Sequence, residues 1–165
     1  MVISGLPGTG KSTVAQAVAR HLEAVHLSID PVEDAMLGAG VRATGVAAYE
    51  VVRVMAEQNL RLDRAVVVDA VNDSEAARQT WRRAALDAGV PLRFVLLVMN
   101  DGATHRRRLE GRTCRFENVP EPTWEQVQAR ATRFEPWSGP VEVIDAGGSL
   151  DAVVALVLAR LRDSQ

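Results

Sequence analysis

The stretch GLPGTGKS, residues 5–12, decides the fold of this chain. It matches the pattern G-x-x-x-x-G-K-S without gaps, and it has the context that the pattern requires, an apolar strand before it and a helix after it. Glycines allow the backbone N–H groups of such a loop to wrap around phosphate oxygens, and the following helix points the positive end of its dipole at the same anion. The stretch therefore predicts a phosphate-binding loop, the alternative being a glycine-rich turn without a ligand.

Individual residues of the loop have expected tasks. Lys11 is expected to bridge the β- and γ-phosphates of ATP, and the Ser12 hydroxyl to bind Mg²⁺. Lys11 is the only lysine of the chain, and a compact ammonium suits this position better than a planar guanidinium. The predicted nucleotide-binding residues are Gly5, Pro7, Gly8, Thr9, Gly10, Lys11, Ser12 and Thr13.

Downstream of the loop, apolar strands alternate with helical segments. The runs Ala65–Asp69 and Leu92–Met99 are almost continuously apolar, as expected of strands buried on both faces. Strands separated by helices of crossover length imply a parallel sheet. We expect one α/β domain over residues 1–165 with a three-layer P-loop NTPase fold, in which helices cover both faces of a parallel five-stranded sheet. The other predicted strands are Val2–Ser4, Val25–Ile29 and Val141–Ile144, and the predicted helices are Lys11–Leu22, Val32–Leu37, Ala47–Leu62, Ser74–Ala88, Thr104–Leu109, Pro122–Phe134 and Leu150–Arg162.

Composition limits the partners and the location. The 165 residues are 47 % hydrophobic, which is enough for a continuous core. A formal net charge of −2 provides no basic field, so nucleic acid and membrane partners are not expected. Cys114, the single cysteine, cannot form an internal disulfide, and no apolar run is long enough for a membrane span or a signal peptide. We therefore expect a cytoplasmic protein, with its oligomeric state left open.

Asp69 is the predicted metal-binding acid. Active sites of parallel sheets lie at the carboxyl ends of the strands, and Asp69 ends an apolar strand there. A carboxylate at this place can hold magnesium directly or through water, together with Ser12. The alternative is a turn aspartate within residues 69–73.

Asp30 follows the second predicted strand and has two possible roles. Phosphoryl transfer to a hydroxyl group requires a residue that orients the hydroxyl and accepts its proton. Asp30 also suits a helix N-cap, because Pro31 would then be the first helical residue and Glu33 the third. The residues alone leave both roles open, and the two are compatible.

Residues 105–122 form an arginine-rich insert that we expect to act as a lid. Arginines that close over a transferring phosphate stabilise its charge and exclude water. Arg108 and Arg112 are four residues apart and share a helix face if the helix extends that far, so they are predicted to be catalytic together with Lys11 and Asp30. The alternative is a solvated basic face. The further arginines of this region are Arg106, Arg107 and Arg115, and on the next helix Arg130 and Arg133.

The acceptor of the phosphate is expected to bind along the segment from Asp30 to Arg53. This segment mixes apolar, aromatic and basic residues, as an amphiphilic pocket would require. The predicted contacts are Met36, Arg42, Tyr49, Arg53 and, outside the segment, Asn72.

No histidine is given a role in the reaction. His21 and His26 flank a helix and a strand, and they are expected to be packing or surface residues. His105 begins a helix near the insert and could be functional, although packing is the simpler interpretation.

These segments make the whole chain resemble small P-loop kinases of the type that includes chloramphenicol phosphotransferase, zeta toxins and polynucleotide 5′-hydroxyl kinases. GLPGTGKST (5–13) is similar to their phosphate loop, and IDPVEDAM (29–36) resembles the segment whose first aspartate is the base. VVVDAVN (66–72) resembles the strand of the metal-binding acid, which usually reads D-A-T-N, with Val71 in place of the threonine. RRRLEGR (106–112) and ARATRFEPW (129–137) resemble the lid and its return. The resemblance implies that Asp30 is the base.

The expected function is that of an ATP- and Mg-dependent phosphotransferase whose acceptor is a hydroxyl group of a small molecule. Candidate acceptors are an antibiotic, which would imply antibiotic resistance, a nucleoside or a sugar derivative. The first alternative is a polynucleotide 5′-hydroxyl kinase, which the net charge of −2 and the aromatic content of 4 % disfavour, because a single strand requires a basic channel with stacking rings. The second is a nucleotide-dependent switch or regulatory ATPase without an acceptor, which needs no base at Asp30.

Overall fold

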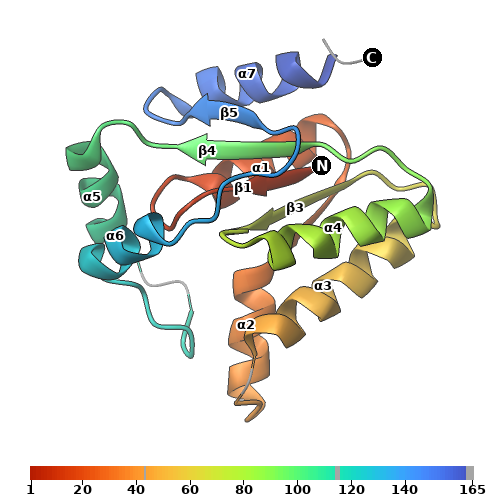
Figure 1. Ribbon diagram of the computed structural model, residues 1–165, viewed down its shortest axis with the longest axis horizontal. Helices are drawn as coiled ribbons and strands as arrows, with labels where there is room; N and C mark the ends of the chain where they lie inside the picture. Colours follow the sequence, from red (N-terminus) through yellow and green to blue (C-terminus); the bar gives the residue numbers. More distant parts are fainter. Residues whose placement is uncertain (43, 114–115, 163–165) are drawn as a thin grey trace.

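Strands and helices alternate along the chain, as Figure 1 shows for the computed structural model. The structure describes residues 1–42, 44–113 and 116–162. The strands are β1 (Val2–Ser4), β2 (Val25–Ser28), β3 (Val66–Ala70), β4 (Phe94–Val98) and β5 (Glu142–Asp145). The helices are α1 (Lys11–His21), α2 (Ile29–Gly38), α3 (Gly45–Leu60), α4 (Glu75–Ala88), α5 (Gly102–Glu110), α6 (Trp124–Thr132) and α7 (Leu150–Arg162).

The five strands form one parallel sheet in the order β2-β3-β1-β4-β5. β1 lies in the centre, with Ile3 opposite Asp69 of β3, and Ser28 of β2 is also opposite Asp69. The ends of β1, β2 and β3 therefore meet at the edge where the phosphate loop begins. Figure 1 shows α5 and α6 beyond the ends at which the strand arrows point. The predicted fold class is confirmed.

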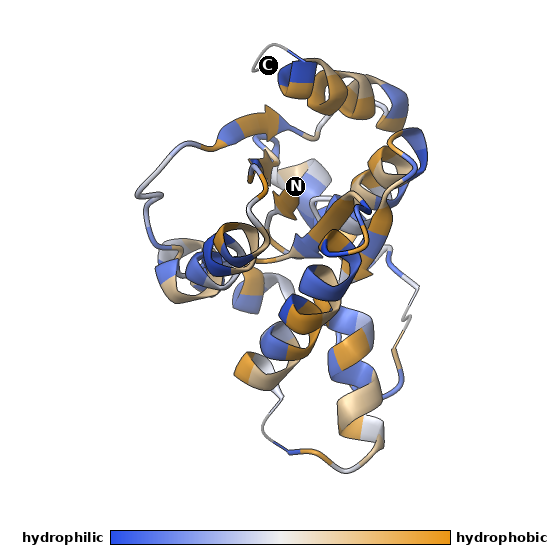
Figure 2. Ribbon diagram, turned by 90° about the vertical axis from the view of Figure 1, so that its right-hand side faces the viewer, coloured by the Kyte–Doolittle hydropathy of each residue, from blue (hydrophilic) through white to orange (hydrophobic). Residues whose placement is uncertain are grey.

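Helices cover both faces of the sheet because successive strand residues point to opposite sides. Val67 of β3 packs in a core with residues of α1 and α7. Its neighbours Val66 and Val68 pack in a second core with residues of α3 and α4, including the fully buried Trp81. Figure 2 shows the resulting hydrophobic strands between the helices. This double cover explains the uninterrupted apolar run in β3.

Helix boundaries differ from the prediction by a few residues at several places, and two of the observed boundaries bear on the site. α2 begins at Ile29 with Ser28 as its N-cap residue, so the interpretation of Asp30 as an N-cap is wrong. Ser28 has extended backbone angles, φ −124° and ψ 142°, and β2 therefore runs directly into the helix. α5 ends at Glu110, so Arg112 does not share a helix face with Arg108.

No helix within residues 1–42, 44–113 and 116–162 combines the length and the apolar character that a membrane-spanning helix needs.

Candidate active site

The loop between β1 and α1 has the backbone conformation that its glycines permit. Gly8 and Gly10 have φ values of +87° and +86°, in the left-handed region that other residues rarely adopt. A Cβ atom on Gly8 would also lie 3.0 Å from His105 Cδ2 and 3.1 Å from Leu109 Cβ of α5. Thr9 Oγ1 donates a hydrogen bond of 2.9 Å to the carbonyl of Leu6 and closes the loop. The Thr9 hydroxyl therefore fixes the loop internally, and α5 packs against it at Gly8.

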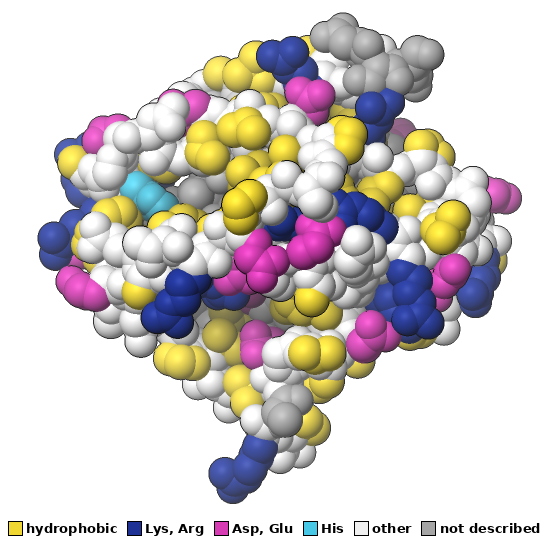
Figure 3. All heavy atoms as spheres, in the orientation of Figure 1, with side chains coloured by type: hydrophobic (Ala, Val, Ile, Leu, Met, Phe, Trp, Pro, Cys, Tyr) yellow, Lys and Arg dark blue, Asp and Glu magenta, His cyan; other side chains and the backbone are white. Residues whose placement is uncertain are grey.

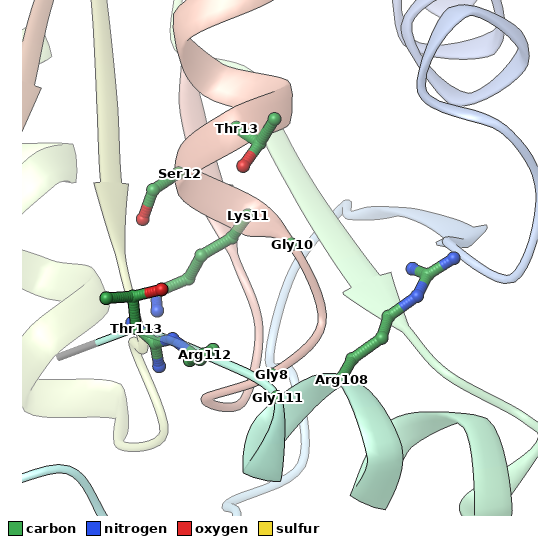
Figure 4. A pocket seen from close by; sticks show the side chains of 9 residues that line it. All are labelled: Gly8, Gly10, Lys11, Ser12, Thr13, Arg108, Gly111, Arg112 and Thr113. Atoms are coloured by element: carbon green, nitrogen blue, oxygen red, sulfur yellow. The ribbon is translucent and has the colours of Figure 1, made fainter. Parts of the chain in front are cut away.

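A cavity of about 340 Å³ opens at this loop (Figure 4). Side chains of α1 and of the segment after α5 enter it from opposite sides, and Figure 4 shows Lys11 and Arg112 extending toward the same region. Its lining residues are Gly8, Gly10, Lys11, Ser12, Thr13, Arg108, Gly111, Arg112 and Thr113. The backbone and the cations needed for a phosphate group are thus gathered in one place.

The two predicted lid arginines differ in their contacts. Arg108 points away from Lys11 in Figure 4, and its Nη1 donates a 2.7 Å hydrogen bond to the carbonyl of Ala146. Arg112 Nη1 lies 3.1 Å from Glu121 Oε2, and both side chains are half-buried. Arg112 is therefore placed at the loop, whereas Arg108 lines the cavity with its guanidinium bound elsewhere. Arg115 of the predicted lid, like Cys114, lies outside the described residues.

Asp69 lies next to Ser12 at the end of the sheet. It belongs to β3 itself and not to the following turn, which removes the alternative of a turn aspartate. Ser12 Oγ donates to Asp69 Oδ1 at 3.2 Å, and the carboxylate is only 1 % exposed. A hydroxyl and a carboxylate oxygen are the hard ligands that Mg²⁺ prefers. The pair fits a magnesium ion that takes its remaining ligands from phosphate and water.

Asp30 lies in the first turn of α2, between two cavities of about 270 Å³ and 160 Å³. Within the described part of the chain, its carboxylate has no hydrogen-bond or ion-pair partner. Arg112 and Phe116 line both cavities with it. The larger cavity has an apolar wall, and the smaller one contains Lys11 and charged groups of α2 and α6. Asp30 is thus exposed to two spaces that a small molecule can enter.

The five predicted acceptor contacts do not line these two cavities. Arg53 forms ion pairs with Glu50 and Glu57 along α3, and Arg42 is exposed beyond the end of α2. Met36 and Tyr49 pack against the core between the sheet and α3. Other residues reach these two cavities: Leu27, Val32, Glu33, Val52, Met55 and Phe116.

Asn72 is corrected from a substrate contact to a structural residue. Its side chain is fully buried, and Nδ2 donates to Ser4 Oγ at 2.9 Å while Oδ1 accepts from Trp81 Nε1 at 2.8 Å. Its backbone carbonyl accepts a 3.0 Å bond from Arg78 Nε. Both ends of the amide have buried partners and the side chain is not exposed, so Asn72 fixes the turn after β3.

Tyr49 supports this turn from α3. Its hydroxyl accepts a 3.3 Å hydrogen bond from the backbone N–H of Asn72. Burial raises the pKa of the Tyr49 hydroxyl to about 12, because the charged phenolate would lose its solvation. Tyr49 therefore stays neutral at physiological pH.

Two histidines have contacts that the sequence analysis did not assign. His105 Nε2 is 2.8 Å from the carbonyl of Pro7, and its ring packs edge-on against Trp124. His26 Nε2 is 2.8 Å from Asp69 Oδ2. The sequence places His26 on the same side of its strand as Ser28, but it does not show that Asp69 of β3 faces them. The sequence gives no signal for the contact of His105 either.

The sheet order, the loop and the helices on both faces define the class of fold, the three-layer α/β fold of P-loop kinases. A gluconokinase from Sinorhizobium meliloti 1021 has a TM-score of 0.69 at 22 % identity, over 99 % of this chain and 93 % of that one. A putative kinase from Chloroflexus aurantiacus j-10-fl has a TM-score of 0.72 at 17 % identity, over 99 % and 96 %. The APS kinase of Mycobacterium tuberculosis, in complex with AMPPNP and APS, has a TM-score of 0.66 at 22 % identity, over 98 % and 96 %.

Sequence comparison places the chain more narrowly. The family described as AAA domain matches residues 1–134, and the chain belongs to this family. A comparison with curated proteins gives no match. The family and the fold account for the loop and the sheet.

Proposed function

We propose that the protein is an ATP- and magnesium-dependent phosphotransferase that moves the γ-phosphate to a hydroxyl group of a small molecule. The observation that carries the proposal is the continuity between the loop and Asp30. Arg112 lines the cavity of the loop and both cavities at Asp30, and Lys11 lines the loop cavity and the smaller of the two. A phosphate on Lys11 would therefore be next to an acceptor at Asp30. The proposed unit is one domain over residues 1–165, with residues 105–122 as its lid.

The chemistry follows from these positions. The loop amides and Lys11 hold the phosphates, and the Asp30 carboxylate orients the acceptor hydroxyl and takes its proton. As the new O–P bond forms, the bond between the γ-phosphorus and the β–γ bridging oxygen breaks and ADP leaves. Arg112 neutralises charge on the transferred group, and Arg108 can join it after leaving the Ala146 carbonyl. Magnesium, when bound at Ser12 and Asp69, supplies further positive charge at the phosphate oxygens.

The size and lining of the cavities support a small acceptor. Volumes of about 270 Å³ and 160 Å³ suit a compact molecule, and the larger cavity has an apolar wall that includes Leu27, Val52 and Met55. The names of the similar structures, a gluconokinase, a sugar kinase and an APS kinase, are those of enzymes for small molecules. An antibiotic, a nucleoside and a sugar derivative all remain in the proposed class. We also propose that the protein is related to the small P-loop kinases of the chloramphenicol phosphotransferase and zeta toxin type.

A polynucleotide acceptor is disfavoured by charge. The net charge is −2, and Figure 3 shows basic and acidic side chains interspersed over one face of the molecule. A channel for a single strand would require a continuous basic surface. The cytoplasm remains the proposed location, in agreement with a single cysteine.

The replacement Asp30→Asn tests the proposal. It should leave the affinity for AMPPNP unchanged and lower phosphoryl transfer by about 100- to 10,000-fold, the usual contribution of a general base. Release of ADP is measured against a panel of hydroxylated antibiotics, nucleosides and sugars to find the acceptor. Asp87→Asn, at an exposed position of α4, is the control and should behave as the wild type. Unchanged transfer by Asp30→Asn would refute the role of the base. Nucleotide-dependent partner binding without any acceptor would indicate a switch.

A further inference from the structure

Asp69 receives three hydrogen bonds from side chains, and one of them comes from a histidine. Ser12 Oγ and Ser28 Oγ donate to Oδ1 at 3.2 Å and 3.1 Å. His26 Nε2 lies 2.8 Å from Oδ2, the shortest of the three contacts. Asp69 is 1 % exposed and the His26 side chain 21 %, so the histidine stands between the buried acid and the larger cavity at Asp30. Each oxygen of the carboxylate therefore has its own set of donors.

The register of the sheet creates this arrangement. β2 pairs with β3 in parallel, with His26 opposite Val67 and Ser28 opposite Asp69. Alternate residues of a strand share a face, so His26 and Ser28 point to the side of Asp69 that α1 covers. Leu27 between them points to the opposite core. The pattern His-x-Ser on β2 thus presents two donors to one carboxylate from the neighbouring strand.

We propose that His26 is a positioning residue for Asp69, one that holds Oδ2 so that Oδ1 stays directed at Ser12 and at the magnesium–nucleotide complex. The inference rests on the proposed function. A carboxylate held at one oxygen cannot rotate about its Cβ–Cγ bond without breaking that hydrogen bond. Partners of this kind, which contact a metal-binding side chain and not the metal, typically change metal affinity or activity by about 10- to 100-fold when they are removed.

The bond requires only that Nε2 carries a proton. The neutral ring with its hydrogen on Nε2 donates to Oδ2, and so does the protonated ring. The function of His26 in this proposal is therefore orientation of Asp69. It differs from packing, because a packing residue would be replaced without loss by an apolar side chain of similar size.

The experiment compares replacements that keep or remove the donor. His26→Leu removes it at similar volume. His26→Gln keeps an N–H group at about the reach of Nε2, and His26→Asn carries the same amide on a shorter side chain. His21→Leu is the control, because His21 is exposed and, among the residues that the structure describes, hydrogen-bonds to the Ala17 carbonyl of its own helix alone. Binding of AMPPNP is measured by calorimetry with EDTA and over a Mg²⁺ titration, so the readout does not depend on turnover.

In the expected result, His26→Leu raises the half-saturating Mg²⁺ concentration by about 10- to 100-fold. The affinity measured in EDTA should stay within a factor of about two, because Lys11 and the loop amides are untouched. His26→Gln should recover most of the Mg²⁺ affinity, and His21→Leu should match the wild type.

Several results would overturn the inference. One is an unchanged Mg²⁺ titration in a folded His26→Leu variant, and another is a folded His26→Gln variant as impaired as His26→Leu. If His26→Leu does not fold, His26→Asn takes its place, and equal Mg²⁺ affinities of the Gln and Asn variants would then refute the role of the donor. Failure of all acceptors to accept phosphate would refute the proposed function without changing this titration, so the two failures are distinguishable.

Discussion

At the scale of single residues, burial decides which polar groups are available to a ligand. Asn72 lies in the turn after β3, Tyr49 contacts this turn from α3, and both have an oxygen or nitrogen that an acceptor could use. Asn72 is fully buried with its amide occupied, and the Tyr49 hydroxyl accepts the backbone N–H of Asn72. Their task is to hold the turn beside Asp69. Asp30, without a partner in the described chain, is the group left for chemistry.

Tyr49 is the only tyrosine, so its ionisation can be followed in isolation. Absorbance at 295 nm should show a midpoint near pH 12 for the folded protein, because burial raises the pKa of Tyr49 to about 12. In urea the midpoint should return to about 10. The pKa of Tyr49 is higher in the folded than in the unfolded protein. Its contribution to the free energy of unfolding is therefore fully present below pH 10 and is lost as the pH rises from 10 to 12. Tyr49→Phe should abolish the absorbance change, and a folded midpoint near 10 would contradict the burial.

At the scale of elements, α5 and the phosphate loop act as one unit. His105 Nε2 bonds to the Pro7 carbonyl, and Gly8 lies against His105 and Leu109. The capping box of Thr123 and Gln126 fixes the start of α6, whose Trp124 contacts the ring of His105. α5 is therefore anchored on the phosphate loop, and the start of α6 on α5.

A comparison of Gly8→Ala with Gly10→Ala tests this contact. Both positions have a positive φ, so both replacements carry a backbone strain of about 1–2 kcal/mol. Only at Gly8 does the new Cβ meet another element, and nothing lies within 4 Å at Gly10 in the described structure. Gly8→Ala should therefore lower the free energy of unfolding by about 1–3 kcal/mol more than Gly10→Ala, as overpacking does. Urea unfolding without nucleotide measures the difference. Equal losses in the free energy of unfolding would show that α5 shifts to make room for the new methyl group.

At the scale of the whole molecule, Arg112 lies where the donor and acceptor halves of the proposed active site meet. It lines all three cavities at the carboxyl edge of the sheet, and its ion pair with Glu121 holds it there. An arginine that lines both the loop cavity and the cavities at Asp30 can contact a nucleotide and an acceptor at the same time. The position is reached by the segment after α5, which is also where the sequence predicted a lid.

Arg112→Ala should lower kcat by about 100-fold, the typical effect of removing a group that stabilises transition-state charge. Its effect on the KM for ATP should be smaller, because Lys11 and the loop remain. Steady-state kinetics with the acceptor found in the ADP screen gives both values. Arg106→Ala is the control, since Arg106 is exposed and paired with Glu110 on α5. A loss confined to KM would show that Arg112 only binds the nucleotide.

Local sequence patterns predicted the phosphate loop and the strand ends around it. The contacts of single side chains depended on which face of a helix they occupy and on which strand residues pair. The loop, the apolar strands and the position of Asp69 depend on residues adjacent in sequence, so they were predicted. Arg53 was misplaced because a helix has several faces, and its neighbours Glu50 and Glu57 hold it along α3. His26 was missed because its role depends on which residue of β3 lies opposite β2. Such pairing requires the sheet order, which the sequence did not contain as a local signal.

Lys11 has one further consequence. Its side chain is the only lysine amine of the sequence, and it is 5 % exposed at the centre of the loop. Acylation by an amine-directed reagent, or acetylation in a cell, thus has a single lysine target, and a single modification there removes the charge on which phosphate binding depends. In most proteins such chemistry is spread over many surface lysines and changes little. Here the extent of lysine modification would be a direct measure of how many molecules can still bind a nucleotide.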